Sequence, residues 1–214
     1  QNPSAQMEGL FMDTASANAP ASLAQVYQFH ISLQEIEPPI WRRFQVRDDT
    51  PLGTLHEIVQ FVMGWEDQHL HEFVFGNTHF GIADDEMGMD VQDEDDATLR
   101  SLGMKVGSVL GYEYDFGDGW EHELLLEEIL PPVPATRYPI CVEGERACPP
   151  EDCGGPFGYE NILRILAMPA KKRSEDDLYM LDWVGEEYDP EEFDIAAVNA
   201  ELAQFAPTRT SWGR

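Results

Sequence analysis

The stretch VYQFHISLQEIEPPIWRRFQVRDDTPLGTLHEIVQFVMG, residues 26–64, contains the first half of the fold. Residues 26–34 and 40–47 alternate apolar with polar side chains and are rich in β-branched and aromatic residues, which predicts two strands. The turn at 37–39 joins them. Over residues 52–64 the apolar side chains recur every three or four positions, which predicts a helix with one buried face, ended by its glycine.

Two hairpins follow this segment. Residues 69–82 predict a hairpin around Gly76-Asn77, because that dipeptide suits a two-residue turn. Strands at 109–116 and 120–130 predict a second hairpin, with a three-residue loop at 117–119. Helices are expected at 97–102, 158–167, 174–183 and 191–205.

The order of elements through residue 130 is β-β-α-β-β-(α)-β-β, which predicts the α+β class. We expect a β-grasp-like sheet, mixed or largely antiparallel, with one main helix packed on it and a C-terminal helical extension. A single domain accounts for most of the chain. The expected divisions are a mobile N-terminal tail (1–24), the domain (25–205, with its sheet core at 25–130 and its Cys/Gly-rich and helical extension at 131–205) and a C-terminal tail (206–214).

The chain is strongly acidic. Its 214 residues include 41 Asp and Glu but only 13 Lys and Arg, for a formal net charge of −28. A protein that grips nucleic acid needs a basic face, so direct nucleic-acid binding is not expected, and anionic membrane surfaces are disfavoured for the same reason. Three cysteines and no secretory signal favour the cytoplasm.

Eighteen of the acids lie in two segments without any basic residue, eight in 84–96 and ten in 175–194. The simplest interpretation is solvated, self-repelling loops. The alternatives are divalent-cation binding, a docking face for a basic partner, or imitation of a nucleic-acid backbone.

The expected hairpin registers sort side chains onto faces. Pairing Phe75 with Thr78 puts His71 on an aromatic face, and pairing Phe116 with Trp120 does the same for His122. The opposite face of the second hairpin would carry Glu113, Asp115, Glu121 and Glu123.

A metal or acid–base centre is one hypothesis for these histidines. His69, His71 and His122 would bind Zn²⁺, Fe²⁺ or Mn²⁺, and Asp115 or Asp118 would add a carboxylate. The alternative is that the imidazoles satisfy polar groups at the edge of an aromatic core.

The cysteine segment offers weaker candidates. Cys141, Cys148 and Cys153 lack the C-x2-C spacing of a typical zinc site, so buried free thiols are favoured over a three-cysteine site. Glu151 and Asp152 are candidate catalytic or metal-binding carboxylates, or they cap turns at the following helix.

Several segments together resemble one known family. They are EPPIWRR (37–43), LHEIV (55–59), WEDQHLHEF (65–73), YDFGDGWEH (114–122), CPPEDCGGPFGY (148–159) and FD (193–194). In this order they resemble the plasmid pRiA4b open-reading-frame-three-like family, also labelled insertion-sequence passenger or TnpR-type proteins. The resemblance covers roughly residues 25–205. It implies a cytoplasmic α+β domain sometimes carried near mobile elements, and it transfers no activity.

Three functions remain open from the sequence. The first is a non-enzymatic binding or adaptor module, without a cofactor, whose acidic and aromatic surface would bind another protein, a basic one included. Its surface would include Trp41, Trp65, Tyr114 and Trp120. This hypothesis is favoured because no catalytic signature is present.

The second function is a metal-dependent hydrolase. It would bind Zn²⁺ or Mn²⁺ through His69, His71 and His122, with Asp115, Asp118 or Glu151 as the base. The third is a nucleic-acid mimic that occupies a basic partner.

Overall fold

The computed structural model describes residues 24–82, 91–185 and 187–205. Both expected tails, apart from residue 24, lie outside the described residues, as do residues 84–90 of the first acidic segment. Within the described residues, no helix is long and apolar enough to cross a membrane.

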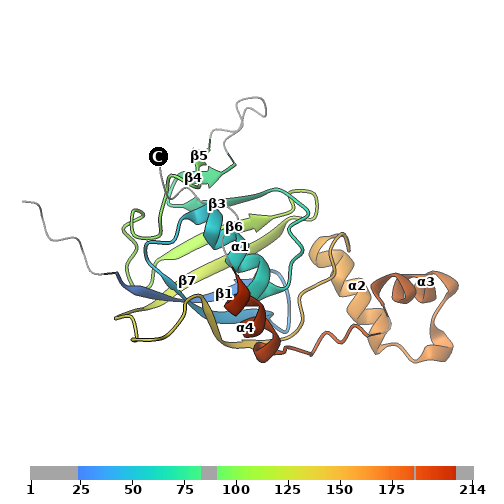
Figure 1. Cartoon of the computed structure of the whole chain (residues 1–214). Coiled ribbons are helices and arrows are strands. Elements are labelled where there is room, and N and C mark those ends of the chain that lie inside the picture. The colour runs from blue at the N-terminus through green and yellow to red at the C-terminus, as the bar shows by residue number, and fades with distance from the viewer. Residues whose placement is uncertain (1–23, 83–90, 186, 206–214) are drawn as a thin grey trace, which may run out of the picture.

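The described residues form one sheet in the strand order β5-β4-β3-β6-β7-β1-β2-β8 (Figure 1). Every neighbouring pair is antiparallel except β4 and β5, which are parallel. The predicted α+β class and largely antiparallel sheet are confirmed, and the β-grasp-like arrangement stays a prediction. The strands are β1 (Val26–Leu33), β2 (Trp41–Arg47), β3 (His71–Phe75), β4 (Thr78–Gly81), β5 (Gln92–Asp93), β6 (Val109–Tyr114), β7 (Trp120–Leu130) and β8 (Ile140–Glu145).

The helices divide between the sheet and a separate lobe. In Figure 1, α1 crosses one face of the sheet with α4 beside it, and α2 and α3 form a lobe beyond the sheet edge. The C-terminal helical extension is therefore present in two parts. The helices are α1 (Leu52–Met63), α2 (Gly155–Ala167), the short 3₁₀ helix η1 (Ala170–Lys172), α3 (Glu175–Val184) and α4 (Ile195–Gln204).

The main core lies between α1 and the sheet. Leu55, Val59 and Val62 of α1 are fully buried, as their spacing predicts. Gly64 ends the helix in the left-handed conformation, with φ 108°. The sheet contributes a layer of buried aromatic side chains: Phe29, Phe44, Phe73, Tyr112, Tyr114 and Trp120.

The first hairpin has the expected register, with Phe75 opposite Thr78. The register expected for the second is wrong, because Tyr114 rather than Phe116 lies opposite Trp120. The chain leaves the strand at Asp115, which has φ 55° and whose Oδ1 accepts a hydrogen bond of 3.0 Å from the Gly117 N–H.

Because the loop is longer than predicted, Phe116 and Asp115 lie in different environments from those expected. Phe116 lies in the loop and is 40% exposed, and the Asp115 side chain is buried instead of facing solvent with Glu113. The alternation within the strands survives, so His122 keeps its predicted place on the aromatic, buried face.

The short helix expected at 97–102 is wrong, because this segment forms turns. Two of its backbone donors bond to a distant segment: the Leu99 N–H donates to the Thr50 carbonyl, and the Arg100 N–H to the Asp48 carbonyl. The Arg100 guanidinium also pairs with the buried Asp48 carboxylate at 2.6 Å. These long-range bonds use donors at the start of the segment and hold it in turns instead of a regular helix.

Candidate metal centre

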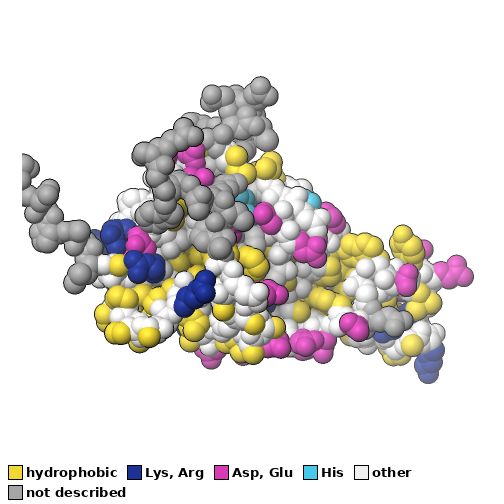
Figure 2. Space-filling model, viewed as in Figure 1, with side chains coloured by type: hydrophobic (Ala, Val, Ile, Leu, Met, Phe, Trp, Pro, Cys, Tyr) yellow, Lys and Arg dark blue, Asp and Glu magenta, His cyan; other side chains and the backbone are white. Residues whose placement is uncertain are grey.

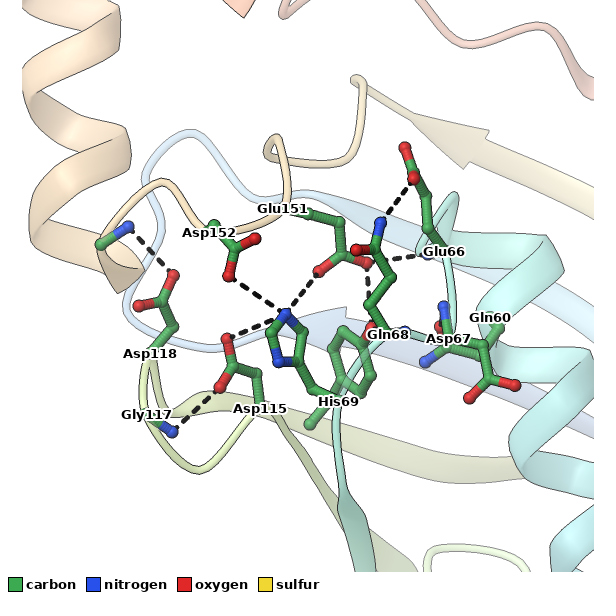
Figure 3. A network of polar contacts seen from close by, with 12 residues as sticks. Gln60, Glu66, Asp67, Gln68, His69, Asp115, Gly117, Asp118, Glu151 and Asp152 are labelled. Atoms are coloured by element: carbon green, nitrogen blue, oxygen red, sulfur yellow. Dashed lines mark hydrogen bonds and ion pairs between the residues drawn. The ribbon is translucent and has the colours of Figure 1, made fainter.

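Strand register creates the candidate site at one end of β3 and β6. These strands are antiparallel neighbours with His71 opposite Tyr114. The residues just before β3 therefore lie beside those just after β6, and the Asp115 N–H donates to the Leu70 carbonyl at 2.9 Å. His69 and Asp115 meet at this end, and the segment between β8 and α2 adds Glu151 and Asp152 (Figure 3).

Three carboxylates surround the His69 Nε2 atom. It lies 3.2 Å from Asp152 Oδ1, 3.6 Å from Asp115 Oδ2 and 3.7 Å from Glu151 Oε2. The side chains of Asp115 and Glu151 are each 10% exposed, that of His69 25% and that of Asp152 65%. The cluster is therefore enclosed on most sides and open to solvent beside Asp152.

Two buried atoms in this cluster, His69 Nε2 and Glu151 Oε2, have no hydrogen-bond partner within the part of the chain that the structure describes. Both point toward the centre of the cluster in Figure 3. Leaving a buried polar atom unpaired costs about 1–3 kcal/mol, so such atoms are rare in folded proteins. Their convergence marks a position where a bound group would restore the missing interactions.

The geometry suits a metal ion. One ligand atom from each of His69, Asp115 and Asp152 lies within 4.8 Å of the other two. Ligands bonded to one ion at about 2.0–2.3 Å lie within such a distance of one another. One imidazole nitrogen with several carboxylate oxygens is a donor set suited to Zn²⁺, Mn²⁺ or Fe²⁺.

Glu151 is held by its other oxygen. Oε1 accepts hydrogen bonds from the Glu66 N–H at 2.8 Å and from the Tyr114 hydroxyl at 3.0 Å. The Tyr114 oxygen in turn accepts from the Gln68 N–H at 2.9 Å. Burial raises the pKa of Tyr114, which keeps the hydroxyl protonated as a donor. Glu151 Oε2 is thereby fixed toward His69.

Asp118 supports the site from outside it. Its Oδ2 atom accepts a hydrogen bond of 2.9 Å from the Gly154 N–H, at the start of α2 (Figure 3). The β6–β7 loop is thus tied to the segment that carries Asp152. Of the predicted base candidates, Asp115 and Glu151 line the cluster, and Asp118 positions its backbone.

The structure does not bring His71 into this cluster. The His71 Nε2 atom lies 2.8 Å from Glu94 Oε2, and both side chains are buried. Its ring also stacks on that of His56. Glu94 belongs to the acidic segment that was interpreted as a solvated loop, and for this residue that interpretation is wrong because its side chain is inside the core.

His122 is also separate from the cluster. Its Nε2 atom accepts a hydrogen bond of 3.1 Å from the Trp65 indole, and its Nδ1 donates to the Trp120 carbonyl at 3.0 Å. Burial lowers the pKa of His122 to about 4, so the ring is neutral at pH 7. This is the alternative role considered for the histidines, satisfaction of polar groups among aromatic side chains.

The three cysteines are free thiols, and Cys141 and Cys153 are buried. Burial raises the pKa of all three, to about 12 for Cys153, so they are protonated at pH 7. The Cys141 Sγ atom lies 3.6 Å from the Arg43 and Glu143 carbonyl oxygens. These contacts fit thiols packed in the interior.

The aromatic surface expected from four residues does not form as predicted. Trp65, Tyr114 and Trp120 are buried in the core, because they belong to the inner face of the sheet and to the loop that covers it. Only Trp41 is partly exposed, and its ring stacks on His30 with the centroids 5.0 Å apart. A protein partner therefore cannot contact three of these four rings in this fold.

Sequence comparison identifies the family. Residues 25–197 match the plasmid pRiA4b ORF-3-like proteins. The chain belongs to this family. It is 38% identical over 178 residues to the uncharacterized protein y4hQ of Sinorhizobium fredii, a match that covers 83% of this chain and 88% of y4hQ.

A solved structure of another protein shares the fold. The crystal structure of MM3350, a protein of unknown function from Methanosarcina mazei Go1, matches with a TM-score of 0.73 and 38% sequence identity. The match covers 82% of this chain and 98% of MM3350.

Two features of the site were missed from the sequence. The sequence pairs Asp152 with Glu151 but does not link it to His69, and it does not predict that Tyr114 and Gln68 fix Glu151. The pairing of β3 with β6 explains why His69 lies beside Asp115, and this proximity could be predicted from strand register. No local sequence pattern predicts that the segment before α2, which carries Glu151 and Asp152, lies beside His69.

Proposed function

We propose that this member of the pRiA4b ORF-3-like family is a metal-dependent hydrolase that binds a divalent ion through His69, Asp115 and Asp152. The supporting observation is the His69 Nε2 atom, which has no hydrogen-bond partner among the described residues but lies among three carboxylates at 3.2–3.7 Å. This retains one of the three predicted histidines and replaces the other two with carboxylates.

A simple ion pair explains the cluster less well. A protonated imidazole makes charge-assisted hydrogen bonds of about 2.7–2.9 Å to a carboxylate. The shortest distance from His69 Nε2 is 3.2 Å, to the mostly exposed Asp152 side chain. The longer distances support our proposal of an ion held by His69, Asp115 and Asp152, with the Glu151 carboxylate beside it.

The chemistry follows from the surroundings of the ion. A bound Zn²⁺ or Mn²⁺ lowers the pKa of a coordinated water toward neutrality and polarises a substrate carbonyl or phosphoryl oxygen. Glu151 Oε2 would accept a proton from such a water, because its other oxygen is held by the Glu66 N–H and the Tyr114 hydroxyl. The exposed side, next to Asp152, is where a substrate would approach.

Calorimetric titration of chelator-treated protein with Zn²⁺ and with Mn²⁺ tests the metal. We expect one ion per chain, with at least tenfold weaker binding in His69→Gln and Asp152→Asn. Glu187→Gln is the matched control, because this exposed acid lies between α3 and α4 and should leave the affinity unchanged. Equal affinity in all four proteins would reject the site.

Hydrolysis is tested separately on p-nitrophenyl acetate and bis-p-nitrophenyl phosphate. We expect turnover that requires the added ion and is lost in Asp152→Asn, while Glu187→Gln keeps it. Stoichiometric metal binding with no turnover of esters, phosphodiesters or peptides would reject the hydrolase and leave the metal site.

A further inference from the structure

The helix α3 (Glu175–Val184) has two unlike sides. Its inward side chains, which pack on α2, are half-buried, and none of its residues is fully buried. Its outward side chains are all exposed, and the outward face includes three large apolar groups. The inward set is Asp177, Met180, Leu181 and Val184, and the outward set is Glu175, Asp176, Leu178, Tyr179, Asp182 and Trp183.

The apolar groups on the outward face are continuous. Tyr179 and Trp183 are four residues apart, so their side chains are neighbours on the helix surface, and Leu178 borders them. Their exposed fractions are 75%, 47% and 53%. On the α2–α3 lobe in Figure 2, hydrophobic and acidic side chains lie next to one another. Tyrosine and tryptophan gathered on a surface are typical of the energetic centre of protein interfaces.

The helix is held in place before any partner arrives. Ser174 and Asp177 form a capping box at its start, and the Arg164 guanidinium pairs with Asp177 at 3.3 Å. The Arg173 guanidinium donates to the Ile165 and Leu166 carbonyls at the end of α2. The outward face is therefore presented on a preorganised support, which lowers the entropic cost of binding.

The charge around this face indicates the chemistry of its partner. The outward face carries three acids, Glu175, Asp176 and Asp182, and no base, while the exposed Lys171 and Lys172 lie in η1 before the helix. A second copy of this chain would bring the same acids and a net charge of −28, so self-association is opposed by repulsion. An anionic membrane is disfavoured for the same reason.

We infer that the outward face of α3 is a docking surface for a basic segment of another protein, whose apolar side chains cover Tyr179 and Trp183 while its Lys or Arg side chains meet Asp176 and Asp182. Arginine stacks well on exposed aromatic rings, so both halves of the surface favour the same partner. This surface lies on the lobe and is independent of the proposed metal centre. It restores the predicted acidic and aromatic binding surface with different residues.

A labelled peptide of alternating Arg and Leu is the probe, followed by fluorescence anisotropy with the full chain. We expect saturable binding that weakens with salt, and at least tenfold weaker binding in Trp183→Ser and in Tyr179→Ser. Asp182→Asn should weaken binding less and reduce its salt dependence. Circular dichroism melting curves establish that each variant is folded.

The controls separate this surface from general stickiness. Phe157→Ser removes an aromatic ring that is 83% exposed on α2, outside the proposed face, and should bind the peptide as the wild type does. His69→Gln should also bind normally. The inference is overturned if Phe157→Ser weakens binding as much as Trp183→Ser, if a Glu–Leu peptide binds equally well, or if sedimentation shows a dimer that Trp183→Ser abolishes.

Discussion

The rings of His56 and His71 stack inside the core, with centroids 3.4 Å apart and planes 3° from parallel. His56 comes from α1 and His71 from β3. The Tyr112 hydroxyl donates to His56 Nδ1 at 2.8 Å, and His56 Nε2 donates to Asp67 at 2.9 Å. Burial, and next the neighbouring His71, lower the pKa of His56 to about 4, so its ring is neutral at pH 7.

This arrangement predicts acid sensitivity above the usual carboxylate range. The folded-state pKa values of His56 and His122 are both about 4, whereas an unfolded histidine has a pKa of about 6.5. Below about pH 6.5 the unfolded chain therefore binds protons that the folded chain does not. Each histidine should cost the fold of the order of 3 kcal/mol as the pH falls to about 4.

Urea unfolding curves measured between pH 8 and pH 4 check this expectation. His56→Gln removes one of the two groups, so the loss of stability over this range should shrink relative to the wild type. If the unfolding free energy depends on pH identically in both proteins, His56 does not contribute to the acid sensitivity.

Arg42 leads to a second prediction, because among the residues that the structure describes its buried guanidinium donates hydrogen bonds only to backbone carbonyls. It donates to Val62 and Met63 at the end of α1, at 2.8 and 3.2 Å, and to Glu145 of β8 at 2.7 Å. The Phe193 ring lies 3.9 Å from its Cζ atom. Arg42→Met should cost about 3 kcal/mol or more, since several buried carbonyls lose their donors.

Arg47→Met is the matched comparison for Arg42→Met. Arg47 forms an exposed pair with Asp49 at 2.7 Å, so its loss should cost no more than about 1 kcal/mol. Arg42→Lys should rescue little, because one ammonium group cannot replace the planar fork of donors. Urea denaturation of the three variants decides the point, and equal losses for Arg42→Met and Arg47→Met would contradict it.

Local patterns were enough to predict most of the sheet and α1. Alternation gave β1 and β2, and the three- and four-residue spacing gave the buried face of α1. The failures involve bonds between distant segments. Residues 97–102 form turns because their backbone bonds to Asp48 and Thr50, and Asp115 lengthens the second hairpin through its own side chain.

The candidate site was predictable only in part, for the same reason. Residue type identified His69, Asp115 and Glu151 as candidates, and strand register explains why the first two meet. Asp152 reaches them through a loop whose path depends on contacts such as that between Asp118 and Gly154. No periodicity in the sequence reports such a contact.

Gly155 tests how that loop is held. It has φ 68°, and a Cβ atom there would overlap the Asp118 carbonyl oxygen. Gly103 has a similar φ of 65° but open space around it. Gly103→Ala therefore measures only the loss of folding stability caused by the positive φ. Gly155→Ala should lose at least about 1 kcal/mol more, because the Asp118 backbone must also move away from the new Cβ atom. Thermal unfolding of both variants measures this difference. Equal losses of stability would show that the loop moves without an energetic penalty.

Glu151→Gln tests whether Glu151 acts as a base or as a metal ligand. The glutamine Oε1 can still accept from the Glu66 N–H and the Tyr114 hydroxyl, so the side chain should stay in place. The amide at the other position cannot take a proton. We expect metal affinity to change only a few-fold, while metal-dependent hydrolysis of the test ester falls by about 10²–10⁴-fold. A comparable loss of metal affinity would instead make Glu151 a ligand, and unchanged turnover would remove it from the reaction.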